Sequence, residues 1–170
     1  MKEIQLTQGM IALIDDEDFE RVNQFNWCAK KHRNTFYAIR FKIINGKNSN
    51  ETLHYFIMQI KGVDHINGNG IDCQKSNMRE CTNQQNTMNS RPRKNSTSKF
   101  KGVSWHNRDN KWCSQIMKDG KNYYLGQYDN EIEAAIVYDK KAKELFGEFA
   151  YLNFPSQFDK WIEQTNKTIK

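Results

Sequence analysis

The segment 63–86, VDHINGNGIDCQKSNMRECTNQQN, constrains the fold of this chain more than any other. Two short stretches with strand character flank a loop that contains two Asn-Gly pairs, and such pairs favour tight turns. Thr82 and Gln85 then match the capping box with which many helices begin. The segment therefore predicts a ββα unit: a strand over 63–66, a long loop, a strand over 77–81 and a helix from Thr82 to about residue 90.

Four polar side chains of this segment are candidates for one site: Asp64, His65, Asn77 and Asn86. Hard divalent ions take oxygen ligands and often use only one or two protein side chains. Asp64 and Asn86 would supply such oxygens if the helix packs against the first strand. A neutral imidazole can take a proton from water near neutral pH, and an asparagine amide can orient its ring. These residue types suit a metal ion and a base around one phosphate, although asparagines beside glycines also serve as simple turn formers.

Positive charge is concentrated in the middle and C-terminal part of the chain. The segment 88–125 has nine lysines and arginines and two aspartates, so it carries +7, and the formal net charge of +6 leaves −1 for the rest. Such a concentration is the electrostatic footprint of a polyanion partner. A solvated basic face is the alternative that charge alone leaves open.

Length and composition limit the other possibilities. The 170 residues suit one domain or two small ones, and a mean hydropathy of −0.92 allows only a small core. No stretch approaches the ~20 apolar residues of a membrane span. The opening MKEIQLTQG lacks the apolar core of a secretion signal, so we expect a cytoplasmic protein that is not secreted. The cysteines form no C-x-x-C pair, and we expect free structural thiols.

The part before residue 63 predicts a β-rich extension, because short apolar or alternating stretches are separated by turn residues. The first expected elements are strands over 3–6 and 10–14, followed by a short helix that Asp15 and Asp16 can cap and that runs through about Phe25. Strands over 27–31 and 35–43 follow, joined by a turn at 32–34, and a second turn is expected at Asn45-Gly46. The run over 51–60 is expected to begin as a strand and to become a helix from about Leu53.

The part after residue 90 predicts a different architecture. Residues 91–99 contain proline, serine and basic residues without apolar periodicity, which is typical of a linker. The expected elements beyond it are strands over 102–106, 111–118 and 121–127, a helix over 130–146 ended by Gly147, and a polar tail over 156–170. The predicted fold class is α+β: a small mixed domain over 1–90 with the ββα unit, then over 100–155 a three-stranded antiparallel sheet packed on one helix.

The residues DHINGNG and SNMRECTNQQN strongly resemble the HNH (His-Me finger) nucleases, specifically the small homing endonucleases of phages and introns. The resemblance covers about residues 1–90. It implies that the ββα unit is a metal finger in which Asp64 and Asn86 hold one divalent ion, Mg²⁺ or Mn²⁺. It further implies that His65 is the general base, and that Asn77 orients this histidine and ties the loop.

Two departures from the family pattern bear on other positions. Tyr55 stands where the family usually has the arginine of an L-H-R sequence, and Cys73-Gln74 replaces the common Asn-Arg after Asp72. Both leave the four core positions intact. They favour a structural or phosphate-facing role for His54 rather than that of a base.

The segments KGVSW, YLGQY, EAA…YD and LNF, between residues 101 and 154, resemble the APETALA/ERF-type DNA-binding domain of plant transcription factors, which also occurs fused to HNH nucleases. In that family the sheet enters the major groove, which admits an antiparallel ribbon. The resemblance places these residues toward DNA: Lys101, Ser104, His106, Arg108, Gln115, Met117, Asn122 and Tyr124. Several family positions with Arg or Trp are Ser, Met or Asn here, so we expect a different sequence preference. Trp112 is expected to pack in the core.

The basic residues of the predicted linker are expected to follow the phosphate backbone, which raises affinity without reading sequence. They are Arg91, Arg93, Lys94 and Lys99. The sequence thus predicts a metal-dependent endonuclease on double-stranded DNA, without an obligate protein partner, that nicks or cuts a site located by its C-terminal domain. Two alternatives stay open: a DNA-binding or regulatory protein with an idle nuclease motif, and a nuclease directed at RNA.

Overall fold

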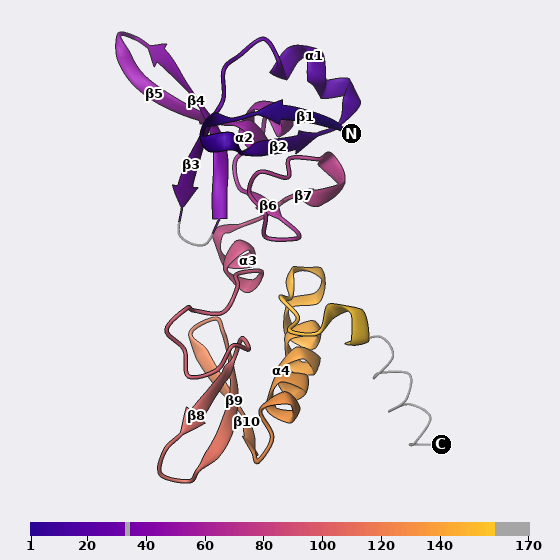
Figure 1. The fold of residues 1–170 in the computed structure, drawn as a ribbon. Helices are drawn as coiled ribbons and strands as arrows, with labels where there is room; N and C mark the ends of the chain where they lie inside the picture. The colour runs from indigo at the N-terminus through magenta and orange to yellow at the C-terminus, as the bar shows by residue number, and fades with distance from the viewer. Residues whose placement is uncertain (33–34, 159–170) are drawn as a thin grey trace. The chain divides into compact units, whose positions relative to one another are not determined.

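The computed structural model describes residues 1–32 and 35–158, and the chain divides into two compact units, Met1–Thr87 and Met88–Lys170. Both units mix short antiparallel sheets with helices (Figure 1), which confirms the predicted α+β class. Most of the turn predicted at 32–34 and most of the predicted tail lie outside the described residues. Of the helices in the described part, none is long and apolar enough to cross a membrane.

The N-terminal unit opens with an antiparallel hairpin of β1, Lys2–Gln5, and β2, Ile11–Ile14, as predicted. Its backbone also pairs with the loop that follows β6. The Leu13 N–H donates to the Ile71 carbonyl at 2.9 Å, and the Cys73 N–H donates to the Leu13 carbonyl at 2.8 Å. The hairpin is therefore bound directly to the segment that the sequence singles out.

The predicted helix from Asp15 to Phe25 is shorter than expected. A 3-10 turn covers Asp16–Asp18, and α1 covers only Phe19–Val22. The expected caps are used elsewhere: Asp15 Oδ2 accepts from the Lys75 N–H at 2.7 Å, and Asp16 pairs with the terminal amine. At the end of the helix, the Val22 carbonyl accepts from the indole of Trp27 at 3.0 Å and from the Phe25 N–H at 3.2 Å.

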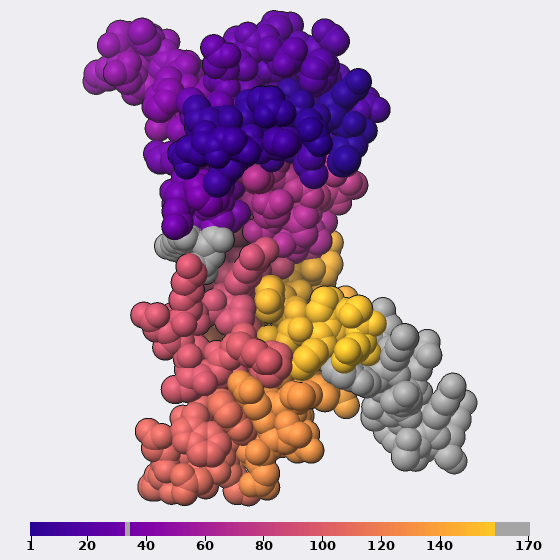
Figure 2. All heavy atoms as spheres, viewed as in Figure 1, coloured from indigo at the N-terminus to yellow at the C-terminus, as the bar shows by residue number. Residues whose placement is uncertain are grey.

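The second sheet has the order β3-β4-β5, with β3 at Cys28–His32, β4 at Thr35–Ile44 and β5 at Lys47–Thr52. The turn at Asn45-Gly46 is confirmed, with both residues at positive φ. The start of β5 was not predicted, because KNSN has no apolar alternation; its pairing with β4 is what makes it a strand. The helix predicted from about Leu53 is α2, Leu53–Met58. Figure 2 shows the tip of the β4–β5 hairpin standing out from the rest of its unit.

The ββα succession is present in the predicted order. β6, Val63–His65, pairs antiparallel with β7, Met78–Glu80, and α3 covers Asn83–Met88. The capping box is confirmed in both directions. The Thr82 N–H donates to Gln85 Oε1 at 2.8 Å, and the Gln85 N–H donates to Thr82 Oγ1 at 3.2 Å. The core beneath these elements contains the fully buried Ile14, Val22 and Leu53.

The C-terminal unit is a three-stranded antiparallel sheet of order β10-β9-β8 covered on one face by α4 (Figure 1). The strands are β8, Val103–His106, β9, Lys111–Lys118, and β10, Lys121–Tyr128, and α4 covers Glu131–Phe146. Asn130 caps the helix by accepting from the Ile132 N–H at 2.8 Å. Every one of these elements was predicted within a residue or two.

The segment predicted as a linker contacts the C-terminal unit near its end. Ser98 is buried, and its hydroxyl donates to Glu131 at 2.7 Å; Thr97 accepts from the Trp105 N–H at 2.9 Å. Trp112 packs with the buried cluster of Val103, Ala134 and Ala135, as predicted. All four cysteines are free, which confirms that prediction.

Candidate active site and nucleic-acid interface

β6 places Asp64 and His65 side by side in the chain, and both are buried, at 4% and 5% exposure. Because successive side chains of a strand point to opposite faces, the two groups have different surroundings. Asp64 is in register with Arg79 of β7, which donates to its Oδ2 from Nε at 3.0 Å and from Nη2 at 2.7 Å. The carboxylate is thereby charge-compensated inside the protein.

The imidazole of His65 lies among rings and a thiol. Its centroid is 5.2 Å from that of His54 and 5.8 Å from that of Tyr37, and its Nε2 is 3.8 Å from Cys73 Sγ. Burial lowers the pKa of His65 to about 4, although the charges of Asp64 and Asp72 act in the opposite direction. The ring is therefore neutral near pH 7 and has a lone pair with which to accept a proton.

His54 shares this environment. Its Nε2 is 3.0 Å from Thr52 Oγ1, whereas its Nδ1 is buried and has no hydrogen-bond partner among the described residues. The pKa of His54 is also lowered to about 4, mainly by burial and to a smaller extent by the neighbouring His65. His54 and Tyr37 come from α2 and β4, outside the ββα unit, so no pattern local to the sequence motif indicates that they border the site.

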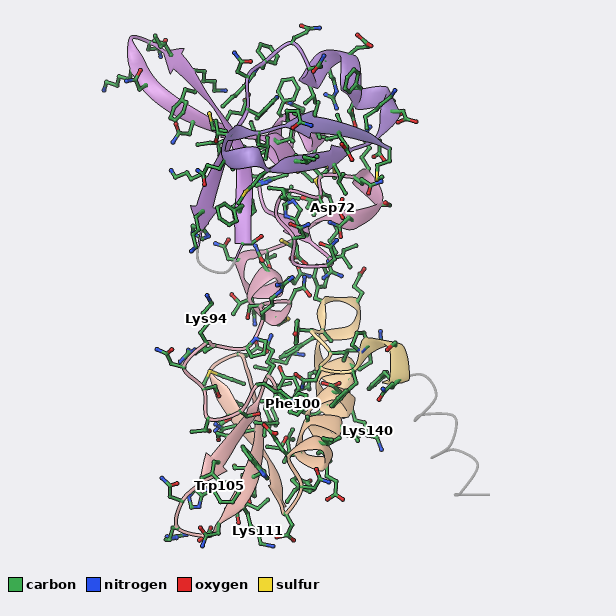
Figure 3. All side chains as sticks on the ribbon, viewed as in Figure 1. Asp72, Lys94, Phe100, Trp105, Lys111 and Lys140 are labelled. Atoms are coloured by element: carbon green, nitrogen blue, oxygen red, sulfur yellow. The ribbon has the colours of Figure 1, made fainter. Side chains whose placement is uncertain are left out.

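Asn77 stands just before β7 and holds the intervening loop together. Its Oδ1 accepts from the Asn67 N–H at 3.0 Å, and its Nδ2 donates to Asn67 Oδ1 at 3.1 Å and to the Asp72 carbonyl at 2.8 Å. Within the described residues its amide makes no hydrogen bond to the imidazole of His65. The position of Asp72 in this loop is visible in Figure 3.

Asn86 is exposed on α3, and its amide is not hydrogen-bonded to Asp64 or His65 in the described part of the chain. The described residues contain no cluster of three His, Cys, Asp or Glu side chains that could hold a metal ion by itself. A carboxylate and an amide oxygen are nevertheless hard donors of the kind that Mg²⁺ and Mn²⁺ accept, with water and phosphate completing the shell. The donor chemistry fits such an ion.

Two further residues of this region were missed at the sequence level. Arg79 could have been found, because pairing the two predicted strands antiparallel places it opposite Asp64. The role of Gly70 could not have been found from the sequence, because it depends on a tertiary contact. A Cβ at this position would lie 2.5 Å from the Tyr37 ring and 2.6 Å from the Phe36 carbonyl. The loop approaches β4 this closely only because residue 70 has no side chain.

The sheet of the C-terminal unit has one face toward α4 and one face away from it. On β9, Ser114 and Ile116 are buried, and the hydroxyl of Ser114 donates to the Ala134 carbonyl of α4 at 2.9 Å. The β9 residues that alternate with them therefore face outward, and so do the residues paired with those on β8 and β10. By strand register the outward face carries these predicted DNA contacts: Ser104, His106, Gln115, Met117, Asn122 and Tyr124.

Two side chains of this face are held by neighbours. Asn122 Nδ2 donates to Gln115 Oε1 at 3.0 Å, and these amides come from adjacent strands. In the turn after β8, Asp109 lies 3.1 Å from His106 Nδ1 and 3.0 Å from Arg108 Nε. The face is thus an ordered array of amides, a thioether, an imidazole and a phenol.

Lys101 differs from the other predicted DNA contacts. Its ammonium donates to the Met88 carbonyl at 2.5 Å and lies 5.5 Å from the centre of the Tyr151 ring. Burial lowers the pKa of Lys101 to about 8. This side chain therefore contacts residues of its own unit. By contrast, the other basic residues near Lys101 in the sequence are exposed: Arg91, Arg93, Lys94 and Lys99. Figure 3 shows Lys94 pointing away from the ribbon.

Comparison with known proteins bears on both units. Residues 98–148 match the AP2 domain family. An uncharacterised HNH endonuclease of Acanthamoeba polyphaga mimivirus is 31% identical over 155 residues, which cover 86% of this chain and 76% of the relative. Protein 3.8 of Escherichia phage T7 is 31% identical over 88 residues, covering 52% of this chain and 72% of the relative.

The third relative matches the C-terminal part. An ethylene-responsive transcription factor of Arabidopsis thaliana is 36% identical over 75 residues, which cover 44% of this chain and 17% of the relative. No solved structure shows a significant match.

Proposed function

The chain belongs to the HNH endonucleases that carry an AP2-type domain, and on this premise we propose that it hydrolyses phosphodiester bonds of double-stranded DNA in a metal-dependent reaction. The observation that carries the proposal is the pair of buried neighbours on β6: a charge-compensated carboxylate, Asp64, and a neutral imidazole, His65. The loop tied by Asn77 and the helix with Asn86 complete the set of residue types that the family uses.

His65 acts as the general base. Its burial keeps it unprotonated near neutral pH, so that its lone pair can take a proton from an attacking water molecule. The water oxygen then forms the new bond to phosphorus while one ester bond breaks. The surrounding rings of His54 and Tyr37 limit the orientations of the imidazole and exclude bulk water from its buried edge.

Asp64 and Asn86 would hold one divalent ion, Mg²⁺ or Mn²⁺. Such an ion, when bound, would polarise the scissile phosphate and stabilise the leaving oxygen. Arg79 pairs with the carboxylate of Asp64 inside the protein. Asn77 maintains the loop conformation that places β6 and β7 around the phosphate.

The C-terminal unit binds the duplex. Its outward sheet face presents donors, acceptors and apolar groups to base edges, and the exposed lysines and arginines before it bind phosphates. With one active site per chain, a monomer would nick one strand, whereas cutting both strands would require two chains or two successive events. A phage- or intron-type homing role in a cytoplasmic setting fits this combination.

The test is cleavage of supercoiled plasmid by wild type with Mg²⁺, with EDTA, and by His65→Ala. His32→Ala, which removes an exposed imidazole from β3, is the matched control. We expect nicked or linear product only when both the metal ion and His65 are present, with His32→Ala as active as wild type.

If wild type fails to cut plasmid and genomic DNA yet binds duplex DNA as tightly as His65→Ala, the protein is a DNA-binding protein with an idle nuclease motif. Cleavage of duplex RNA in preference to duplex DNA would instead contradict the proposed substrate, because the narrow major groove of A-form RNA excludes a protein sheet.

A further inference from the structure

One face of the β4–β5 hairpin carries apolar side chains that the rest of its unit leaves uncovered. Phe41 is 68% exposed and Ile43 is 75% exposed, and residues two apart on a strand share one face. The register of the hairpin places Asn50 opposite Phe41 and Asn48 opposite Ile43. Both asparagines are exposed, so this face combines two apolar side chains with two amides.

The opposite face of the hairpin is held against its unit. Arg40 Nε donates to Glu51 Oε2 at 2.7 Å, and Lys42 Nζ donates to Glu51 Oε1 at 2.6 Å. The guanidinium of Arg40 also lies 3.8 Å from the centre of the Phe25 ring and 4.6 Å from that of Phe56. The hairpin is thus anchored before any partner arrives, which lowers the entropy that binding costs.

The sheet that contains the hairpin is a second region of concentrated positive charge. Residues 28–52 contain six lysines and arginines and one glutamate, so they carry +5. Segment 88–125 carries +7, and the net charge of +6 therefore leaves −6 for all other residues. Lys30 and Lys47 are exposed, whereas Glu51 is buried and paired. This surface is complementary to a polyanion.

The apolar face is continuous with the candidate active site. Tyr37, whose ring centroid is 5.8 Å from that of His65, lies on β4 and alternates onto the same face as Phe41 and Ile43. At ~3.3 Å per residue, the two apolar side chains lie roughly 13–20 Å along the strand from Tyr37. With a rise of about 3.4 Å per base pair, this spacing corresponds to about four to six base pairs of a duplex.

We propose that the β4–β5 hairpin binds the minor groove of the substrate duplex and inserts Phe41 and Ile43 between neighbouring base pairs, which bends the DNA close to the scissile phosphate. This rests on the proposed cleavage of duplex DNA, and it assigns a DNA contact to the N-terminal unit. Proteins that bend DNA from the minor groove use apolar wedges such as Phe and Ile together with amide and basic side chains. Asn48 and Asn50 supply the amides here.

The test measures the bend with full-length protein in EDTA, so that no cleavage occurs. The probe is a mixed-sequence duplex of about 30 base pairs with a fluorescence donor and acceptor at its ends. We expect wild type to raise energy transfer, as for a bend of about 20–90°. Phe41→Ala with Ile43→Ala should lose this rise and weaken binding on the order of tenfold, whereas Phe41→Leu with Ile43→Leu, which keeps an apolar wedge, should retain both.

Ile44→Ala is the matched control. It removes an isoleucine of the same strand that is 45% exposed but alternates onto the opposite face of the hairpin. This variant should bend DNA like wild type, and melting temperatures verify that all variants are folded. Equal energy transfer for wild type and the double alanine variant, or an equal loss in Ile44→Ala, would overturn the proposal.

A second duplex identifies the groove. Inosine in place of guanosine removes the amino group that guanine presents in the minor groove and leaves the major-groove edge unchanged. We expect wild type to bind the inosine duplex more tightly than the parent duplex, and the double alanine variant to bind the two alike. Equal affinities for wild type would contradict binding in the minor groove.

Two further outcomes are decisive. If the double alanine variant changes a wild-type dimer into a monomer in sedimentation experiments and leaves energy transfer unchanged, the apolar face is a contact between two copies and the proposal is wrong. If wild type bends DNA but does not nick plasmid with Mg²⁺, the proposed hydrolysis fails and the hairpin contact stands. Nicking without a change in energy transfer would contradict the hairpin contact alone.

Discussion

Arg79 donates two hydrogen bonds to the same carboxylate oxygen of Asp64, one from Nε and one from Nη2, across the paired strands β6 and β7. The Asp64 side chain is only 5% exposed and that of Arg79 13% exposed. A buried carboxylate without a partner is costly, so this pair is expected to contribute to the stability of the N-terminal unit.

Removal of the guanidinium should therefore destabilise the protein. We expect Arg79→Met to lower the free energy of unfolding by about 3–5 kcal/mol, because it removes the guanidinium that pairs with the buried carboxylate of Asp64. The double variant Asp64→Asn with Arg79→Met should regain much of this loss, since the uncompensated charge is gone. Urea denaturation without metal measures both. Equal midpoints for wild type and Arg79→Met would show that the pair contributes nothing.

Stability should fall with acidification in a window set by His54 and His65. Their folded-state pKa values are about 4, below the value of about 6.5 expected for an unfolded chain, so between these pH values the unfolded state binds more protons. Unfolding thus becomes easier as pH falls from about 6.5 toward 4, by at most about 3 kcal/mol per histidine. Urea titrations at several pH values should show a shallower slope for His54→Gln. An equal slope in that variant would contradict the assignment.

The outward face of the C-terminal sheet should dominate DNA binding. In the His65→Ala background, Tyr124→Ala should weaken binding to duplex DNA about tenfold, because Tyr124 is 63% exposed on that face. Lys140→Ala is the control, since Lys140 lies on α4, which covers the other face (Figure 3). Fluorescence anisotropy measures both. Equal losses for the two variants would mean that the sheet face is not the binding surface.

The exposed basic residues before the sheet should act through phosphates alone. Arg93→Ala and Lys94→Ala should each lower the slope of log K against log salt by about 1, without changing the preference among duplex sequences. Lys101→Ala should behave differently: it should reduce stability, because its ammonium contacts the Met88 carbonyl. Anisotropy over a salt series, together with melting curves, separates the two outcomes.

Gly70 should not tolerate a side chain. In Gly70→Ala the new Cβ would meet the Tyr37 ring at 2.5 Å and the Phe36 carbonyl at 2.6 Å, so the loop must shift away from β4. We expect a loss of about 1–3 kcal/mol in stability and reduced plasmid nicking. The φ of Gly70 is outside the left-handed region, so the cost arises from the contact and not from backbone strain. A wild-type melting temperature would contradict this reading of the contact.

Local signals made most of the fold predictable. The capping box of Thr82 and Gln85 fixed the start of α3, and alternation with turn pairs located β8, β9 and β10. The predicted elements were wrong where a residue far away in the sequence determines the local structure. α1 is short because Asp15 binds Lys75 instead of capping the helix, and KNSN is a strand because β4 pairs with it.

The candidate site also has a part that was predictable from local sequence and a part that was not. Asp64, His65, Asn77 and Asn86 share one segment, so their types and spacing were visible in the sequence. Their surroundings were not: Tyr37 and His54 reach His65 from other elements, and the contact between Cys73 and the ring depends on how the loop closes. Lys101 matches a DNA-facing position by sequence, but its contacts with Met88 and Tyr151 depend on tertiary packing.

The backbone pairing between β2 and the loop after β6 has a consequence for folding kinetics. Leu13 pairs with residues almost 60 positions later, and Asp15 accepts from the Lys75 N–H across a separation of 60 residues. Closing so large a loop costs entropy before any contact repays it, and structures rich in such distant contacts fold slowly. The catalytic segment is therefore expected to become ordered late, after the hairpin has formed, and a peptide of residues 63–86 alone would lack the partner strand that shapes it.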